Sequence, residues 1–316
     1  MPPPMDERIR DKFLGSMIGG AIGDAIGELA FRHPSRDGLI RIIESSEEIP
    51  YTDDTAMAIG VAESLIAHGT ILPEALGRQF HANYRAEPWR GYGPGPPRIF
   101  RTVERSGLPY VEASRSLFGG QGSFGNGAAM RVGPVGLFFY DAEDLYEKAS
   151  ASALPTHAHP VGRDGAAVQA GAVAQAVTLE PGQGFSRSAF LDHLLRTSRT
   201  EEMQEKLSLL KTCLAEDVPP DRAVRILGRS VAVHESQPFA LYAFLRHPDS
   251  FEECLLCAVL HGGDRDTIGA MAGAVSGAYL GVRAVPRAWR EKIEKRSLLE
   301  ALASNLMKAR NRYRGV

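Results

Sequence analysis

Two rows of glycines, each with a spacing of four residues, constrain the fold more than any other feature of this sequence. The first row comprises Gly15, Gly19, Gly23 and Gly27, and the second comprises Gly269, Gly273, Gly277 and Gly281. Each glycine inside a helix costs about 0.5–1 kcal/mol relative to alanine, so four in one helix need compensation from packing. A ridge at i and i+4 without side chains lets another backbone approach closely. The flanking Met, Ile, Ala and Val residues argue against a flexible, poorly formed helix, and the pattern predicts two helices buried at the centre of a bundle.

The rest of the chain also has a helical pattern. Apolar residues recur with a period near 3.6 in nearly every segment between turns. The predicted helices span residues 6–30, 53–68, 73–84, 96–106, 110–116, 141–152, 163–179, 187–197, 201–214, 219–232, 237–246, 250–260, 266–281 and 287–309. VGLFFY at 135–140 is the one candidate strand and fits a buried turn equally well. We predict an all-α fold in a single domain over residues 1–316, with residues 1–5 disordered.

Composition and charge narrow the choice of partners. The formal net charge is −2, which gives no electrostatic case for binding nucleic acid or an anionic membrane. Asp24 and Glu28 interrupt the first glycine-rich stretch, and no apolar run reaches the length of about 18 residues that a membrane span needs. Three cysteines cannot build a disulfide framework, which favours a reducing compartment. We therefore expect a cytoplasmic monomer that binds neither nucleic acid nor membranes.

Two short acidic clusters, far apart in the sequence, share one chemistry. They are Thr52-Asp53-Asp54 and Asp264-Arg265-Asp266-Thr267. Each stands where a polar turn enters a helix rich in Ala, Gly and Met, and each offers two carboxylates and a threonine hydroxyl. Hard divalent cations such as Mg²⁺ prefer oxygen ligands of this kind, and the two clusters together would hold two ions. Helix capping is the alternative, because Ser, Thr and Asp favour helix N-termini.

Glycine-rich loops supply a candidate ligand site. Residues 122–127, GSFGNG, form a turn whose N–H groups could cradle phosphate oxygens, although they also fit a simple tight loop. No Walker or Rossmann pattern surrounds this turn. Phe118 and Phe124 could hold a flat ring such as adenine or belong to the core. His157 could donate to a phosphate or a sugar hydroxyl, and zinc is disfavoured there because no third soft ligand lies near. With the acidic clusters, the loops suggest a nucleotide-sugar diphosphate whose sugar end meets the metals.

Several motifs, in their order along the chain, resemble the ADP-ribosylglycohydrolase family. They are GDAIGE, YTDDTAMA, RGYGPG, QGSFGNGAAMR, THAH and HGGDRDTIGAMAGAVSGAYLG. Within that family, YTDDTAMA, GSFGNGAAMRV and HESQPFALYAFLR are most similar to the branch that removes ADP-ribose from serine and degrades poly(ADP-ribose). The similarity covers essentially the whole chain.

The resemblance implies an all-α orthogonal helical bundle with two Mg²⁺ ions at its centre. The implied metal ligands are Thr52, Asp53, Asp54, Asp264, Asp266 and Thr267. The segment implied to surround the diphosphate and ribose comprises Gln121, Gly122, Ser123, Phe124, Gly125, Asn126 and Gly127. Further implied contacts are Phe118 and Phe124 to the adenosine, Gly91 and Gly93 to the distal ribose, His157 to the diphosphate and Val231 to the nucleotide.

One position departs from the family pattern. Relatives usually carry a glutamate seven residues after the aspartate of the GD motif, on a mobile flap over the metals. Counting from Asp24 puts Phe31 at that position, and the nearest carboxylate is Glu28. Either Glu28 takes the role from a different register, or the flap over residues 28–38 works without a glutamate.

The activity implied by the resemblance is hydrolysis of the glycosidic bond of ADP-ribose attached to protein through serine, with poly(ADP-ribose) or O-acetyl-ADP-ribose as further substrates. Asp54 and Asp264 are the candidates to take a proton from the attacking water, and Glu28 is the third catalytic candidate. Arginine-linked ADP-ribose, as cleaved by the dinitrogenase reductase-activating type, is the alternative substrate. A non-catalytic ADP-ribose-binding module would have lost metal ligands, and none is lost here; the intact motifs also argue against a purely structural protein.

Overall fold

The computed structural model describes residues 5–315, and this part of the chain is almost entirely helical. Its α-helices are α1 (Met5–Arg32), α2 (Arg36–Ser45), α3 (Asp53–His68), α4 (Pro73–Ala86), α5 (Gly95–Ser106), α6 (Tyr110–Arg115), α7 (Leu117–Gly120), α8 (Gly133–Phe138), α9 (Leu145–Ala153), α10 (Pro160–Thr178), α11 (Arg187–Thr197), α12 (Glu201–Ala215), α13 (Pro220–Leu227), α14 (Val233–Arg246), α15 (Phe251–His261), α16 (Arg265–Leu280), α17 (Arg287–Lys292) and α18 (Arg296–Arg314). Two short 3-10 helices are η1 (Asn126–Ala128) and η2 (Val282–Ala284).

The all-α prediction is confirmed. Between residues 5 and 315, β structure is limited to two isolated bridges, Ile49–Ile293 and Gly125–Ala232. None of the helices in this range combines the length and the apolar character that a membrane span requires. The single-domain assignment stays a prediction. The predicted disorder of residues 1–5 lies outside the described residues except at Met5, where α1 begins.

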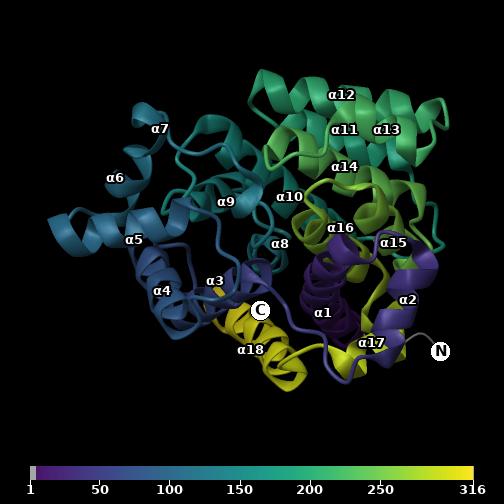
Figure 1. Cartoon of the computed structure of the whole chain (residues 1–316), viewed down its shortest axis with the longest axis horizontal. Helices are drawn as coiled ribbons and strands as arrows, with labels where there is room; N and C mark the ends of the chain where they lie inside the picture. Colours follow the sequence, from purple (N-terminus) through teal and green to yellow (C-terminus); the bar gives the residue numbers. More distant parts are fainter. Residues whose placement is uncertain (1–4, 316) are drawn as a thin grey trace.

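The two glycine-rich helices pack against each other in antiparallel order. Figure 1 shows α1 beside α16, and their contact is the most extensive between any two helices of the described chain. A Cβ atom at Gly15 would overlap the carbonyl group of Gly277, and one at Gly23 would overlap that of Gly269. Backbone therefore meets backbone along the whole contact, which confirms that the glycines mark buried helices.

Three predicted elements differ from the structure, one of them in that the helix predicted over 219–232 ends at Leu227 as α13. Residues 135–138 of VGLFFY belong to α8, and residues 139–140 form the turn that follows it. Pro134 stands in the first turn of this helix, and all residues of α8 are buried, so no polar face reveals its period. The predicted helix over 287–309 is two helices, α17 and α18. The break covers residues 293–295, and Lys295, at the N-cap of α18, adopts a left-handed φ of 52°.

The predicted flap over residues 28–38 is mostly helix. α1 continues to Arg32 and α2 begins at Arg36, so only residues 33–35 form a turn. Ser35 caps α2 by accepting a hydrogen bond from the N–H of Gly38. Arg36 forms two hydrogen bonds with the carboxylate of Glu253 in α15, at 2.9 and 2.5 Å. The sequence analysis did not predict α2, because the proline before it is typical of a loop.

Candidate active site

Asp24 of α1 organises the first acidic cluster. Its buried carboxylate accepts hydrogen bonds from the N–H groups of Thr52 and Thr55 at 3.0 Å and from their hydroxyls at 2.7 and 2.6 Å. The Thr52 hydroxyl has one proton, and Asp24 is the nearer of its two acceptors, since Asp54 Oδ2 lies 3.3 Å away. Donation to Asp24 leaves the lone pairs of the Thr52 oxygen available as ligands. Thr52 and Asp264 stand at the N-cap positions of α3 and α16, but neither side chain caps its helix. Capping therefore does not account for either cluster.

Both acidic clusters line one cavity of about 310 Å³. The predicted site residues on its walls are Asp53, Asp54, Gly91, Gly93, Phe118, Ser123, Gly125, Asn126, Gly127, His157, Val231, Asp264, Asp266 and Thr267. A volume in this range is usual for a site that binds a small organic ligand. The fold therefore brings together residues from both ends of the chain at the N-termini of α3 and α16.

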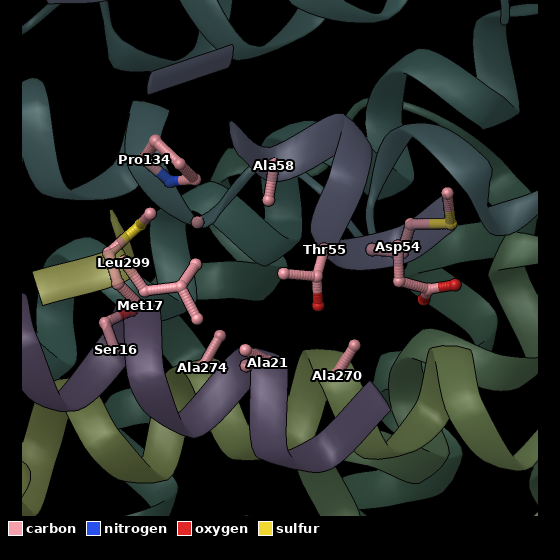
Figure 2. Close-up of a pocket in the computed structure, with 13 residues that line it drawn as sticks. Ser16, Met17, Ala21, Asp54, Thr55, Ala58, Pro134, Ala270, Ala274 and Leu299 are labelled. Atoms are coloured by element: carbon pink, nitrogen blue, oxygen red, sulfur yellow. The ribbon is translucent and has the colours of Figure 1, made fainter. Parts of the chain in front are cut away.

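The carboxylates at this cavity are buried and repel one another. Burial, followed by the charges of neighbouring aspartates, raises the pKa of Asp53 to about 8 and that of Asp266 to about 7. Burial and then Asp24 raise the pKa of Asp54 well above its usual range. The Oδ1 atom of Asp54 is buried without a hydrogen-bond partner. Figure 2 shows the Asp54 carboxylate at one end of a small internal cavity of about 30 Å³ between α3 and the α1–α16 pair.

The residue types at this site are those that bind divalent cations. Ionised carboxylates only accept, and buried carboxylates that repel one another are stabilised by a cation among them. The unpartnered Oδ1 of Asp54 and the inward-donating hydroxyl of Thr52 fit the same role. Within residues 5–315, however, no three His, Cys, Asp or Glu side chains stand together as a ready-made ligand set. The site with two Mg²⁺ ions therefore stays a prediction.

Metal-free protein should lose stability as the pH rises. A carboxylate with a raised folded-state pKa contributes stability that is fully present below its unfolded pKa of about 3.9 and is lost as the pH passes its folded pKa. For Asp266 and Asp53 that loss extends up to pH values of about 7 and 8. In EDTA, the melting temperature should be lower at pH 8 than at pH 6. Added Mg²⁺ should raise it more at pH 8, and an equal rise at both pH values would contradict this account of the carboxylates.

The glycine-rich loop after α7 is held by contacts that use some of its own amides. The N–H of Gly125 donates to Ser123 Oγ at 3.1 Å, and the N–H of Asn126 donates to the carbonyl oxygen of Val231 at 2.8 Å. The N–H of Gly122 donates to the carbonyl oxygen of Leu117 at 3.0 Å. Three amides of residues 122–127, which the sequence analysis proposed as phosphate donors, are therefore already engaged. Fewer amides of this loop are therefore free to bind a phosphate group than the sequence analysis predicted.

Asn126 joins this loop to the second acidic cluster. Its Nδ2 donates to Asp264 Oδ2 at 2.7 Å and to Ser236 Oγ at 3.1 Å. The N–H of Asp264 in turn donates to the carbonyl oxygen of Arg229 at 3.1 Å. The side chain of Asn126 thus faces a carboxylate of the acidic centre and orients it, although the sequence analysis assigned this residue to the diphosphate and ribose.

Exposed apolar side chains surround the mouth of the cavity. Phe118 and Val231 line it and are 63% and 64% exposed. Phe124 is also exposed but lies outside the cavity lining, where its ring packs 5.4 Å from that of His159. Neither phenylalanine belongs to the core, so that alternative is wrong. Of the two, Phe118 stands where a flat ring in the cavity could stack on it.

Glu28 lies beside a second cavity of about 500 Å³ that shares Gly91 and Asp266 with the first. Its charge contributes to the raised pKa of Asp266, after larger effects from burial and other aspartates. Phe31, at the position where relatives usually have glutamate, is 47% exposed. α1 continues past Glu28, so this carboxylate lies one turn beyond Asp24 on a regular helix.

Some predicted residues lie off the main cavity, and some of its walls were not predicted. Thr52 and Glu28 line the second cavity, while Gln121, Gly122 and Phe124 line neither. The walls that the sequence analysis missed are Met57, Pro94, Gly95, Pro96, Met130 and Thr156. An apolar residue in a helix gives the same pattern whether it faces a cavity or the core, so the two methionines carried no signal. The prolines of RGYGPGPP, in contrast, did indicate a loop of the kind that lines binding sites.

Comparisons with known proteins agree with this geometry. The sequence matches the ADP-ribosylglycohydrolase family over residues 5–315. ADP-ribosylhydrolase ARH3 of Bos taurus is 34% identical, with 83% of this chain and 79% of the relative covered. ADP-ribosylhydrolase ARH3 of Homo sapiens is 32% identical, with 95% and 93% covered. A solved structure described as an ADP-ribosylglycohydrolase-related protein complex superimposes with a TM-score of 0.72 at 26% identity, covering 96% of this chain and 99% of that one.

The family match spans both glycine-rich helices, both acidic clusters and the loops around the cavity. The similarity to ARH3 agrees with the branch that the motifs indicated. The chain is an enzyme that acts on glycosyl bonds, and it belongs to the ADP-ribosylglycohydrolase family.

Proposed function

We propose that this protein is a Mg²⁺-dependent hydrolase that releases ADP-ribose from serine side chains of modified proteins. The observation that carries the proposal is the single cavity lined by both acidic clusters and by the glycine-rich loop. The similarity to ARH3 proteins, which are described as ADP-ribosylhydrolases, supports ADP-ribose as the ligand. Poly(ADP-ribose) and O-acetyl-ADP-ribose are further candidate substrates, and a cytoplasmic location and a monomeric state stay predictions.

The cavity walls carry two kinds of chemistry, the glycine-rich loop and the acidic clusters, which would give the substrate a direction. The glycine-rich loop, His157 and Phe118 would bind the diphosphate and adenosine. Gly91 and Gly93 would lie along the distal ribose, whose C1 carries the bond to be broken. The acidic residues at the other end would hold two Mg²⁺ ions, which would supply Lewis-acid stabilisation and orient the ribose hydroxyls.

The aspartates would also serve proton transfer. Asp54 or Asp264 would accept a proton from the water that attacks C1, while the sugar develops oxocarbenium character as the bond from C1 to the serine oxygen breaks. The leaving oxygen would take up a proton to become the serine hydroxyl. Asn126 holds Asp264 through a hydrogen bond of 2.7 Å and would keep its second oxygen directed at the substrate. The hydrogen bond to Asp24 would hold the Thr52 side chain in place.

The linkage is tested by a side-by-side release assay. One peptide sequence, modified with ADP-ribose on serine or on arginine at the same position, is incubated with the protein and Mg²⁺. We expect the serine linkage to be cleaved faster by at least about tenfold, a ratio within reach of differential transition-state binding. Faster cleavage of the arginine linkage would establish the alternative, the dinitrogenase reductase-activating type of activity.

Glu28→Gln tests the displaced glutamate. If Glu28 takes part in proton transfer, the variant should be slower by about a hundredfold with little change in ADP-ribose affinity. Initial rates and calorimetric titration with ADP-ribose would measure the two effects. Glu48→Gln is the matched control, because Glu48 lines the same second cavity but is exposed. An unchanged rate for Glu28→Gln would remove Glu28 from the mechanism.

A further inference from the structure

A row of three buried polar side chains leads from the protein interior to the main cavity. Arg131 Nη2 donates to Thr156 Oγ1 at 2.7 Å, and Thr156 Oγ1 lies 2.8 Å from His157 Nδ1. All three side chains are buried, and only Thr156 and His157 reach the cavity wall. The three groups differ in the protons that they can donate, and this fixes which atom is the donor in each hydrogen bond of the row.

Arg131 fixes the first hydrogen bond. A guanidinium group has only donors, so the oxygen of Thr156 must be the acceptor. Arg131 is itself held by the carbonyl oxygens of Gly127 at 3.0 Å and Ser152 at 3.4 Å, and its guanidinium lies 4.4 Å from the ring centre of Phe80. This side chain therefore cannot rotate away from Thr156 without losing several contacts.

Thr156 fixes the second hydrogen bond. Its hydroxyl has one proton, and within the described residues the only other hydrogen-bond partner of Oγ1 is His157 Nδ1. Donation of that proton to Nδ1 satisfies both atoms and leaves the imidazole proton on Nε2. The opposite tautomer would put two donors face to face or leave a buried hydroxyl proton without an acceptor, which is costly.

His157 Nε2 faces the glycine-rich loop. A Cβ atom at Gly127 would lie 2.8 Å from Cε1 and 3.0 Å from Nε2, so the absence of a side chain there makes room for the ring, and a Cβ atom at Gly125 would lie in ordinary contact with Nε2 at 3.5 Å. Burial, and then the charge of Arg131, lower the pKa of His157 to about 3. The imidazole is therefore neutral across the working range of pH.

We propose that Arg131 and Thr156 are positioning residues that hold His157 as the neutral Nε2–H tautomer, so that Nε2 donates a hydrogen bond to a phosphate oxygen of ADP-ribose. The identity of the ligand rests on the proposed function, whereas the tautomer follows from the hydrogen bonds alone. The opposite tautomer would present a lone pair to an anionic oxygen and repel it. A protonated Nε2 also has no lone pair for a metal, which agrees with the exclusion of zinc at THAH.

The tautomer is measured directly by nitrogen-15 NMR of histidine-labelled, full-length protein without ligand at neutral pH. The resonances of His157, one of nine histidines, are assigned by their loss in His157→Asn. We expect a protonated Nε2 and an unprotonated Nδ1 in the wild type. Proton signals on Nδ1 instead, or on both nitrogens, would overturn the proposal.

Thr156→Val and Thr156→Ser separate positioning from packing. Valine keeps the shape but removes the hydroxyl, so we expect a mixture of His157 tautomers and a dissociation constant for ADP-ribose about tenfold higher by calorimetry, the effect of one lost hydrogen bond. Serine restores the hydroxyl and should restore both the tautomer and the affinity. Equal losses for valine and serine would show a packing effect and overturn the proposal. No ADP-ribose binding by the wild type would instead overturn the proposed function and the phosphate partner.

Discussion

Replacing Asp54 or Asp264 by asparagine should lower the rate of ADP-ribose release by about a thousandfold, the scale of losing several kcal/mol of transition-state stabilisation by bound metal. The fold should persist. Asp54 is buried, with a pKa raised by burial and by Asp24, so a neutral amide relieves an unfavourable charge in the metal-free protein. The melting temperature of Asp54→Asn in EDTA should therefore equal or exceed that of the wild type.

A matched control uses Asp249, an exposed aspartate just before α15. Asp249→Asn changes the net charge by the same amount but should leave the rate unchanged. Rates are compared at saturating Mg²⁺, with melting temperatures measured in parallel. If Asp54→Asn and Asp264→Asn kept the wild-type rate, the acidic centre would have no part in catalysis.

Gly19→Ala should destabilise the protein by about 3 kcal/mol, at the upper end of the usual cost of overpacking a core. The new methyl group would overlap the carbonyl oxygen of Gly273 and lie 2.9 Å from the ring of Phe251. Because the first of these is backbone, the two helices must separate to admit it. Urea unfolding would measure the loss of stability.

Gly20→Ala, at the next position of α1, is the control. Its methyl group would have Ala274 Cβ at 3.5 Å as its nearest neighbour, which is ordinary van der Waals contact. Alanine also favours the helix by about 0.5–1 kcal/mol over glycine. We expect this variant to be as stable as the wild type or slightly more stable. Equal destabilisation at both positions would contradict the close backbone contact of α1 with α16.

The glycine spacing predicted the central helices because it is a local pattern with one physical use. Glycines at i and i+4 remove side chains from one face, and only a close neighbour compensates for their cost. The partner of each helix was not predictable in the same way. That Gly15 faces Gly277, and Gly27 faces Arg265 and Asp266, depends on the antiparallel pairing of segments at opposite ends of the chain.

Site residues that belong to a short sequence motif could be predicted, whereas residues whose role depends on tertiary contacts could not. The acidic clusters and the glycine-rich loop stand out as residue types with few structural uses. The sequence analysis gave Asp24 no role in the site, yet its carboxylate accepts hydrogen bonds from Thr52 of the first cluster and from Thr55, which follows that cluster. The role of Asp24 depends on the contact of α1 with the N-terminus of α3, which cannot be predicted from the sequence pattern. The hydrogen bond of the Asn126 amide depends likewise on the segment around Val231.

The central claim is that the buried acidic residues act by holding Mg²⁺. The most direct test is the initial rate of ADP-ribose release from a serine-modified peptide by EDTA-treated protein, measured as Mg²⁺ is added in excess of the chelator. The account predicts no measurable release in EDTA and a saturable return of activity with Mg²⁺. Release at the full rate in EDTA would contradict it.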